Sequence, residues 1–126
     1  RREKIERIAN YIPEQEVLCD TEADTLLVGW GGTYGHLHQA ADDLNAAGKR
    51  VAFTQFRYIN PLPKNTAEIL GRYNTIIVAE LNTGMFADYL QSKYPHLNIR
   101  RINKIQGQPF LSQEIVDGVT KIMEGK

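Results

Sequence analysis

Short apolar runs that alternate with stretches of helical periodicity constrain the fold of this chain more than any other feature. Thr25–Gly29 (TLLVG) and Thr75–Glu80 (TIIVAE) are apolar at successive positions, which is typical of strands buried on both faces. Arg50–Gln55 (RVAFTQ) is a third strand candidate. Strands of this kind, separated by helices, predict an α/β domain with a mostly parallel sheet that is covered by helices on both faces.

The remaining elements complete this alternation. Two weaker strands are expected at Glu16–Cys19 and Leu97–Ile102. Helices are expected over His36–Ala47, just before Gly71, over Met85–Tyr94 and over Gln113–Met123. Ligands and partners meet such sheets at the carboxyl ends of the strands, so the loops that follow the strands should carry the function.

Length, charge and cysteine content narrow the class of protein. The 126 residues fit one domain, and 15 basic against 15 acidic residues give no basic excess for nucleic acid or an anionic membrane. No apolar run approaches the roughly 20 residues that span a bilayer, and the start RREKIERIAN is not a secretory signal. A single cysteine, Cys19, excludes an internal disulfide framework and a Cys-rich metal site, and it fits a reducing, cytoplasmic location.

The start of the chain suggests a piece of a longer protein. It begins with Arg1 rather than methionine, and isoleucines at helical spacing follow at once: Ile5, Ile8 and Ile12. A polar helix that ends at Pro13 predicts a connector from an upstream domain over 1–13, followed by the domain itself over 14–126. The alternative is an ordinary N-terminal helix of a complete small protein.

The loop GWGGTYG, residues 29–35, allows two interpretations. Glycines between a strand and a helix let backbone N–H groups approach a phosphate at the helix N-terminus. However, the glycine spacing is not G-x-G-x-x-G, and Gln55 and Phe56 stand where a ribose-binding acidic residue is expected. A tight turn that presents Trp30 and Tyr34 to a partner is the favoured interpretation.

No catalytic or metal-binding set is recognisable from the sequence. His36 and His38 are two positions apart, so on a helix they point to different sides and cannot both hold one ion. Glu80 follows a strand and either acts as an acid or base or accepts hydrogen bonds from nearby loop N–H groups. Cys19 precedes the acidic stretch Asp20–Asp24, which should raise the pKa of its thiol and leave it inert.

Two further loops have the composition of protein contacts. FRYINPLP (56–63) combines Arg57 and Tyr58 with rigid prolines, and Arg and Tyr are enriched in interface hot spots. A merely stiff loop is the alternative. NKIQGQPF (103–110) is similar in kind, with amides that include Gln108.

Taken together, these loops resemble a known family. Four motifs in order carry the resemblance: LLVGWGGTYG (26–35), FRYINPLPKN (56–65), VAELNTGMFADYL (78–90) and NKIQGQPF (103–110). They are similar to the C-terminal domain of the alpha subunit of 2-oxoacid:ferredoxin oxidoreductases, and most similar to that of the 2-oxoglutarate enzyme. One departure is Gly32–Thr33, where the family often has a Gly-Ser-Thr type of turn.

The resemblance implies a fold and a reaction. The fold would be like the transketolase C-terminal domain: three α/β/α layers around a five-stranded, mostly parallel sheet with one antiparallel edge strand, for which Glu16–Cys19 is suited. The parent enzyme would convert 2-oxoglutarate, coenzyme A and oxidised ferredoxin into succinyl-CoA, carbon dioxide and reduced ferredoxin. Thiamine diphosphate with Mg²⁺, bound between the alpha and beta subunits, and an iron–sulfur cluster would serve that complex.

Within such a complex the chain is expected to be a non-catalytic assembly domain, inactive alone, that contacts upstream domains of its own subunit and the beta subunit. The expected interface residues are Trp30, Gly31, Gly32, Thr33, Tyr34, Arg57, Tyr58, Asn82 and Gln108. No residue is expected to be catalytic or to bind a cofactor or metal. Two alternatives stay open: a free-standing nucleotide- or phosphate-binding domain, and the equivalent domain of a pyruvate or branched-chain 2-oxoacid enzyme.

Overall fold

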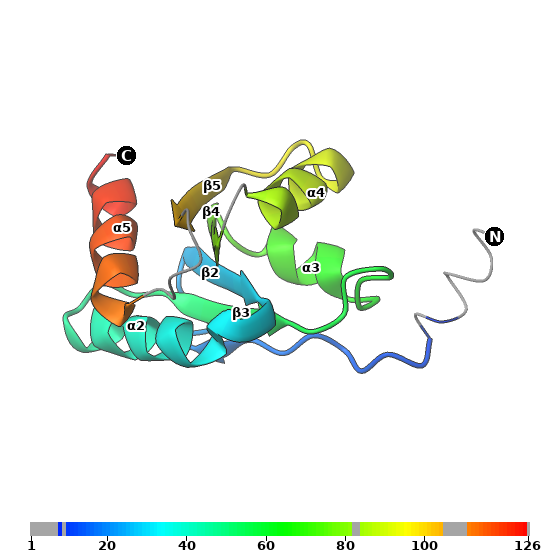
Figure 1. Cartoon of the computed structure of the whole chain (residues 1–126), viewed down its shortest axis with the longest axis horizontal. Coiled ribbons are helices and arrows are strands. Elements are labelled where there is room, and N and C mark those ends of the chain that lie inside the picture. The colour runs from blue at the N-terminus through cyan, green and yellow to red at the C-terminus, as the bar shows by residue number, and fades with distance from the viewer. Residues whose placement is uncertain (1–7, 9, 82–83, 105–110, 126) are drawn as a thin grey trace.

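The computed structural model describes residues 8, 10–81, 84–104 and 111–125, and these form one sheet between two layers of helices (Figure 1). The strands follow the order β1-β3-β2-β4-β5 across the sheet. Strand β1 pairs antiparallel with β3, and the other neighbours pair parallel. The strands are β1 (Leu18–Cys19), β2 (Thr25–Trp30), β3 (Ala52–Phe56), β4 (Thr75–Leu81) and β5 (Ile99–Lys104).

Helices cover both faces of this sheet. They are the 3-10 turn η1 (Gly31–Thr33) and the α-helices α2 (Tyr34–Ala46), α3 (Thr66–Gly71), α4 (Met85–Lys93) and α5 (Ser112–Glu124). Figure 1 shows α2 and α5 on one side of the sheet and α3 and α4 on the other. None of the helices in the described ranges is long and apolar enough to cross a membrane.

The core is divided into two halves by the alternation of side chains along the strands. On β2, Leu26 packs into the half beneath α3 and α4, whereas its neighbour Leu27 packs into the half beneath α2 and α5. Ile76 and Ile77 on β4 divide in the same way, and all four side chains are fully buried. Each central strand therefore must be apolar at successive positions, which explains the runs seen in the sequence.

The predicted fold class is confirmed, with shifts at the ends of several elements. Strand β1 is shorter than expected, because side-chain hydrogen bonds rather than a ladder hold Gln15 and Glu16. Helix α2 begins at Tyr34, two residues early, because η1 turns the chain directly after β2. Of the predicted connector over 1–13, most positions lie outside the described residues, so the domain boundary stays a prediction.

Gly29 allows α2 to pack closely against the sheet. A Cβ atom at this position would lie 2.1 Å from Leu37 Cδ1 on α2 and 2.4 Å from Gln55 Oε1 on β3. Leu37 is fully buried, so it has little room to retreat. Packing therefore explains why Gly29, near the end of β2, is a glycine. At Gly32, in the turn that follows, an added Cβ would have no atom within 4 Å.

The variant Gly29→Ala should be less stable than the natural chain by about 1–3 kcal/mol, because the added methyl group overpacks the contact with Leu37 and Gln55. The free energy of unfolding measured in urea tests this. Gly32→Ala is the matched control and should stay within about 0.5 kcal/mol, since nothing lies within 4 Å of the added atom. Equal losses in the two variants would contradict the packing role.

Candidate functional site

The carboxyl edge of the sheet is organised around one buried carboxylate. The parallel strands β2, β3, β4 and β5 all end at this edge. Glu80, near the end of β4, is only 2% exposed. A buried charge of this kind must be hydrogen-bonded to be stable.

Three N–H groups satisfy the carboxylate. The backbone N–H of Phe86 donates to Glu80 Oε1 and that of Ala87 donates to Oε2, both at 2.9 Å. The indole Nε1–H of Trp30, at the end of β2, donates to Oε1 at 3.3 Å. Phe86 and Ala87 lie in the first turn of α4, where the helix dipole also favours a negative charge. Glu80 thus joins β4, β2 and α4 at one point.

Aromatic rings pack beneath this junction. The Phe86 ring centroid lies 5.7 Å from that of Trp30 and 5.4 Å from that of Phe56, which ends β3. On the other side, Phe86 stacks with Tyr89, whose hydroxyl donates to the Ile59 carbonyl at 3.0 Å. The loop after β3 is therefore tied to α4.

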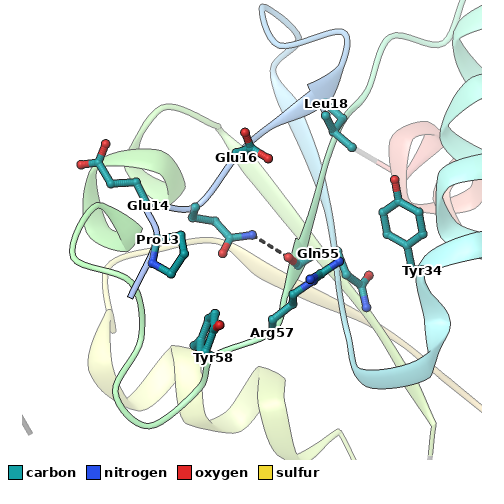
Figure 2. A pocket seen from close by; sticks show the side chains of 9 residues that line it. Pro13, Glu14, Glu16, Leu18, Tyr34, Gln55, Arg57 and Tyr58 are labelled. Carbon is teal, nitrogen blue, oxygen red and sulfur yellow. Dashed lines mark hydrogen bonds between the residues drawn. The ribbon is translucent and has the colours of Figure 1, made fainter. Parts of the chain in front are cut away.

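A pocket of about 340 Å³ opens beside this edge (Figure 2). We call it the edge pocket; it is lined by Pro13, Glu14, Gln15, Glu16, Leu18, Tyr34, Gln55, Arg57 and Tyr58. Figure 2 shows Tyr34 from α2 and Leu18 from β1 on one side and Tyr58 from the loop after β3 on the other. Its lining mixes two carboxylates, one guanidinium and two exposed phenol rings.

The segment before β1 is held in place as one wall of the edge pocket. Gln15 Nε2 donates to Thr54 Oγ1 and to the Gln55 carbonyl, both at 2.7 Å. The Gln15 backbone exchanges two hydrogen bonds with the Asn65 amide, at 2.8 and 2.9 Å. Thr54 Oγ1 in turn donates to the Glu16 carbonyl at 2.6 Å. These bonds fix the wall against β3 and the start of α3.

The predicted interface residues that the structure describes divide into two groups. Tyr34, at the start of α2, and Arg57 and Tyr58, in the loop after β3, are exposed and all line the edge pocket. Gly31–Thr33 form η1, in which Thr33 is buried and donates to the Trp30 carbonyl at 3.2 Å. Trp30 is half-buried and has a structural role toward Glu80.

Two other predicted interface residues, Asn82 and Gln108, lie outside the described residues, so their contacts stay predictions. The interface role of the whole set likewise stays a prediction.

Sequence reasoning missed Gln55, Glu14 and Glu16 as members of this site. Gln55 Nε2 donates to the Gly31 carbonyl at 3.0 Å, and its buried Oε1 has no hydrogen-bond partner among the described residues. Glu14 and Glu16 reach the pocket because β1 runs antiparallel to β3, so the residues before β1 pass the residues that end β3. The antiparallel edge strand was the signal from which the position of Glu14 and Glu16 could have been predicted.

Cys19 has a thiol pKa that is raised to about 11, chiefly because burial disfavours the thiolate and next because Asp42 lies beside it. The predicted direction is correct, but the acidic neighbour is Asp42 on α2 rather than the stretch Asp20–Asp24. Of His36 and His38, the first is exposed, while the second stacks on Phe53 at a centroid distance of 5.7 Å.

The variant Glu80→Gln should lower the free energy of unfolding by about 1–3 kcal/mol, because an amide N–H₂ facing the α4 N-terminus leaves a buried backbone donor without an acceptor. Urea unfolding of the chain measures this. Glu68→Gln, on the exposed surface of α3, is the matched control and should change stability by less than about 0.5 kcal/mol. The role of Glu80 as the junction would be refuted by an equally small effect at both positions.

Comparison with known proteins identifies the family of the domain. The model of the pyruvate:ferredoxin oxidoreductase core domain II matches residues 23–115. The 2-oxoglutarate oxidoreductase subunit KorA of Mycobacterium tuberculosis is 35% identical over 100% of this chain, which covers 19% of that protein. The alpha subunit of 2-oxoacid:ferredoxin oxidoreductase 1 of Aeropyrum pernix is 30% identical over 98% of this chain and 20% of its own length.

Solved structures agree on the fold. The 2-oxoglutarate:ferredoxin oxidoreductase from Magnetococcus marinus, with 2-oxoglutarate, coenzyme A and succinyl-CoA bound, superposes with a TM-score of 0.82 at 23% identity and covers 92% of this chain and 21% of its own. A split-gene transketolase, described as an inactive beta4 tetramer, gives 0.70 at 15% identity over 88% of this chain and 42% of its own.

The chain spans about a fifth of the length of the curated relatives it matches. The resemblance to alpha subunits of 2-oxoacid:ferredoxin oxidoreductases is confirmed, as is the transketolase-like fold. With more than half of its residues matched by one domain model, this chain belongs to the pyruvate:ferredoxin oxidoreductase core domain II family.

Proposed function

We propose that this chain is a non-catalytic assembly domain of the alpha subunit of a cytoplasmic, thiamine-diphosphate-dependent 2-oxoglutarate:ferredoxin oxidoreductase. The proposed complex converts 2-oxoglutarate, coenzyme A and oxidised ferredoxin into succinyl-CoA, carbon dioxide and reduced ferredoxin. The observation that carries the proposal is the 35% identity to a 2-oxoglutarate oxidoreductase subunit along the whole chain. The domain would contact the upstream part of its own subunit and the beta subunit.

The state of Glu80 supports a non-catalytic role. It is the carboxylate best placed for acid–base chemistry, yet both of its oxygens accept hydrogen bonds from α4 and Trp30. A general base must also lie within reach of a substrate proton, and Glu80 is only 2% exposed. We therefore assign Glu80 to holding the edge together.

The described residues do not fit the cofactors of the proposed complex. Mg²⁺ with a diphosphate is held by free oxygen ligands, whereas the buried carboxylate of the edge, Glu80, accepts hydrogen bonds from N–H donors. An iron–sulfur cluster needs several thiolates, and the chain has one cysteine. On this proposal, thiamine diphosphate, Mg²⁺ and the cluster would be held by other parts of the complex.

The edge pocket supports docking of protein rather than of a nucleotide. The lining carries two carboxylates, Glu14 and Glu16, and one guanidinium, Arg57, so its charge does not suit a phosphate. Tyr34 and Tyr58 are each 46% exposed, and tyrosine is a residue type that is enriched in protein interfaces. A polar and aromatic surface of another domain fits this lining.

The proposal is tested with Arg57→Ala and Tyr58→Ala in the full-length alpha subunit. Each should weaken association with the beta subunit, or with the upstream domain, by about fivefold or more, as expected of an interface hot spot worth over 1 kcal/mol. The measurement is the dissociation constant of the subunits by analytical ultracentrifugation, together with limited proteolysis between the domains.

Arg72→Ala, at the exposed end of α3 away from the edge pocket, is the control and should leave association unchanged. Trp30 is not a suitable test, since its loss also removes a hydrogen bond to Glu80. Unchanged association and proteolysis in both edge variants would refute the assembly role.

A further inference from the structure

A second group of reactive side chains lies where β1 meets α2. The Cys19 thiol, the His38 ring and the Asp42 carboxylate each offer one ligand atom, and these atoms all lie within 4.8 Å of one another. Cys19 Sγ lies 3.7 Å from Asp42 Oδ1, and His38 Nε2 lies 4.0 Å from Asp42 Oδ2. The group borders the edge pocket, because Cys19 follows Leu18 and the His38 ring lies 5.4 Å from that of Tyr34, but none of its three residues lines that pocket.

The fold itself brings these three side chains together. His38 and Asp42 are four residues apart on α2, so both project from the same face of the helix. Cys19 ends the edge strand β1, which lies against that face. The His38 ring is oriented by stacking on Phe53 and by contact with Tyr34, at centroid distances of 5.7 and 5.4 Å.

The three ligand types suit one class of ion. Thiolate, imidazole and carboxylate together are the ligands that zinc and similar first-row divalent ions take in tetrahedral sites, at bond lengths of about 2.0–2.3 Å. Such bonds require ligand atoms roughly 3–4 Å apart. Cys19 Sγ lies 3.7 Å from one Asp42 oxygen and His38 Nε2 lies 4.0 Å from the other, and one ligand atom from each residue can be chosen so that all three lie within 4.8 Å of one another. Small side-chain rotations would bring them to the spacing that the ion needs.

There is also room for the ion and its remaining ligand. A hollow of about 350 Å³ adjoins the group and is lined by Cys19, Asp20, Asp42, Asn45 and Arg50. The positive charge of Arg50 is offset there, because its Nε–H donates to Asp20 Oδ2 at 2.6 Å. A water molecule in the hollow would complete a four-coordinate ion.

We propose that Cys19, His38 and Asp42 form a binding site for a divalent transition-metal ion, with Zn²⁺ as the representative ion. The ion would join the edge strand β1 to α2. On binding, the Cys19 thiol releases its proton to solvent and the thiolate, the His38 Nε2 lone pair and one Asp42 oxygen bond to the ion.

This inference differs from the sequence-based expectation that no metal site is present. That expectation considered the spacing of His36 and His38 along the helix. In the structure, the residue grouped with His38 is Cys19 rather than His36. Cys19 lies 19 positions upstream of His38, and only the packing of β1 on α2 brings the two within reach of each other.

The test uses the full-length protein and reads out Cys19 alone. Iodoacetamide modification of the peptide that contains Cys19 is followed by mass spectrometry during a titration with Zn²⁺. Zinc should slow the modification of Cys19 at saturation, and His38→Gln and Asp42→Asn should each weaken the apparent zinc affinity by at least about tenfold. Co²⁺ should give a thiolate charge-transfer band in difference spectra that Cys19→Ser abolishes.

The matched controls are His36→Gln and Asp43→Asn, which make the same chemical changes on the same helix outside the group. Both should keep the zinc protection of Cys19. Circular dichroism checks that all variants fold. Asp42→Asn is an isosteric change of an exposed side chain, so it should leave helix α2 intact. Absence of zinc protection in the natural protein, or equal protection in Asp42→Asn and Asp43→Asn, would overturn the proposal.

Discussion

The carboxylate of Glu80 is the constraint on which the functional edge of this domain depends. A buried charge is destabilising unless fixed donors surround it, and here two backbone N–H groups of α4 and the indole of Trp30 supply them. The ends of β4 and β2 and the start of α4 are thereby held in one arrangement. Among the described residues, the loop after β3 is tied to the same helix by the hydrogen bond from the Tyr89 hydroxyl to the Ile59 carbonyl.

The shape of that surface follows from this junction. Phe86, placed by its bond to Glu80, packs on Phe56 at the end of β3 and on Tyr89. Tyr89 holds the loop that carries Tyr58, on the rim of the edge pocket. The side chains proposed to meet other domains thus stand on rigid elements, which lowers the entropy lost on docking.

Much of the fold could be predicted because apolar runs and glycine or proline stops are local signals. The runs at Thr25–Gly29 and Thr75–Glu80 correspond to the central strands β2 and β4. The contacts of Glu80 could not be predicted in full, because Trp30 lies 50 residues away and meets it only through strand pairing. The grouping of Cys19 with Asp42 is of the same kind, since it depends on where the edge strand packs.

Hydrogen–deuterium exchange of the full-length alpha subunit, alone and assembled with its partner, tests the central claim most directly. If the carboxyl edge is a docking surface, amides in 30–34 and 56–59 exchange more slowly in the assembly, while those of the exposed end of α3 do not change. Unaltered exchange in both segments would contradict the account, whether or not exchange slows elsewhere in the domain.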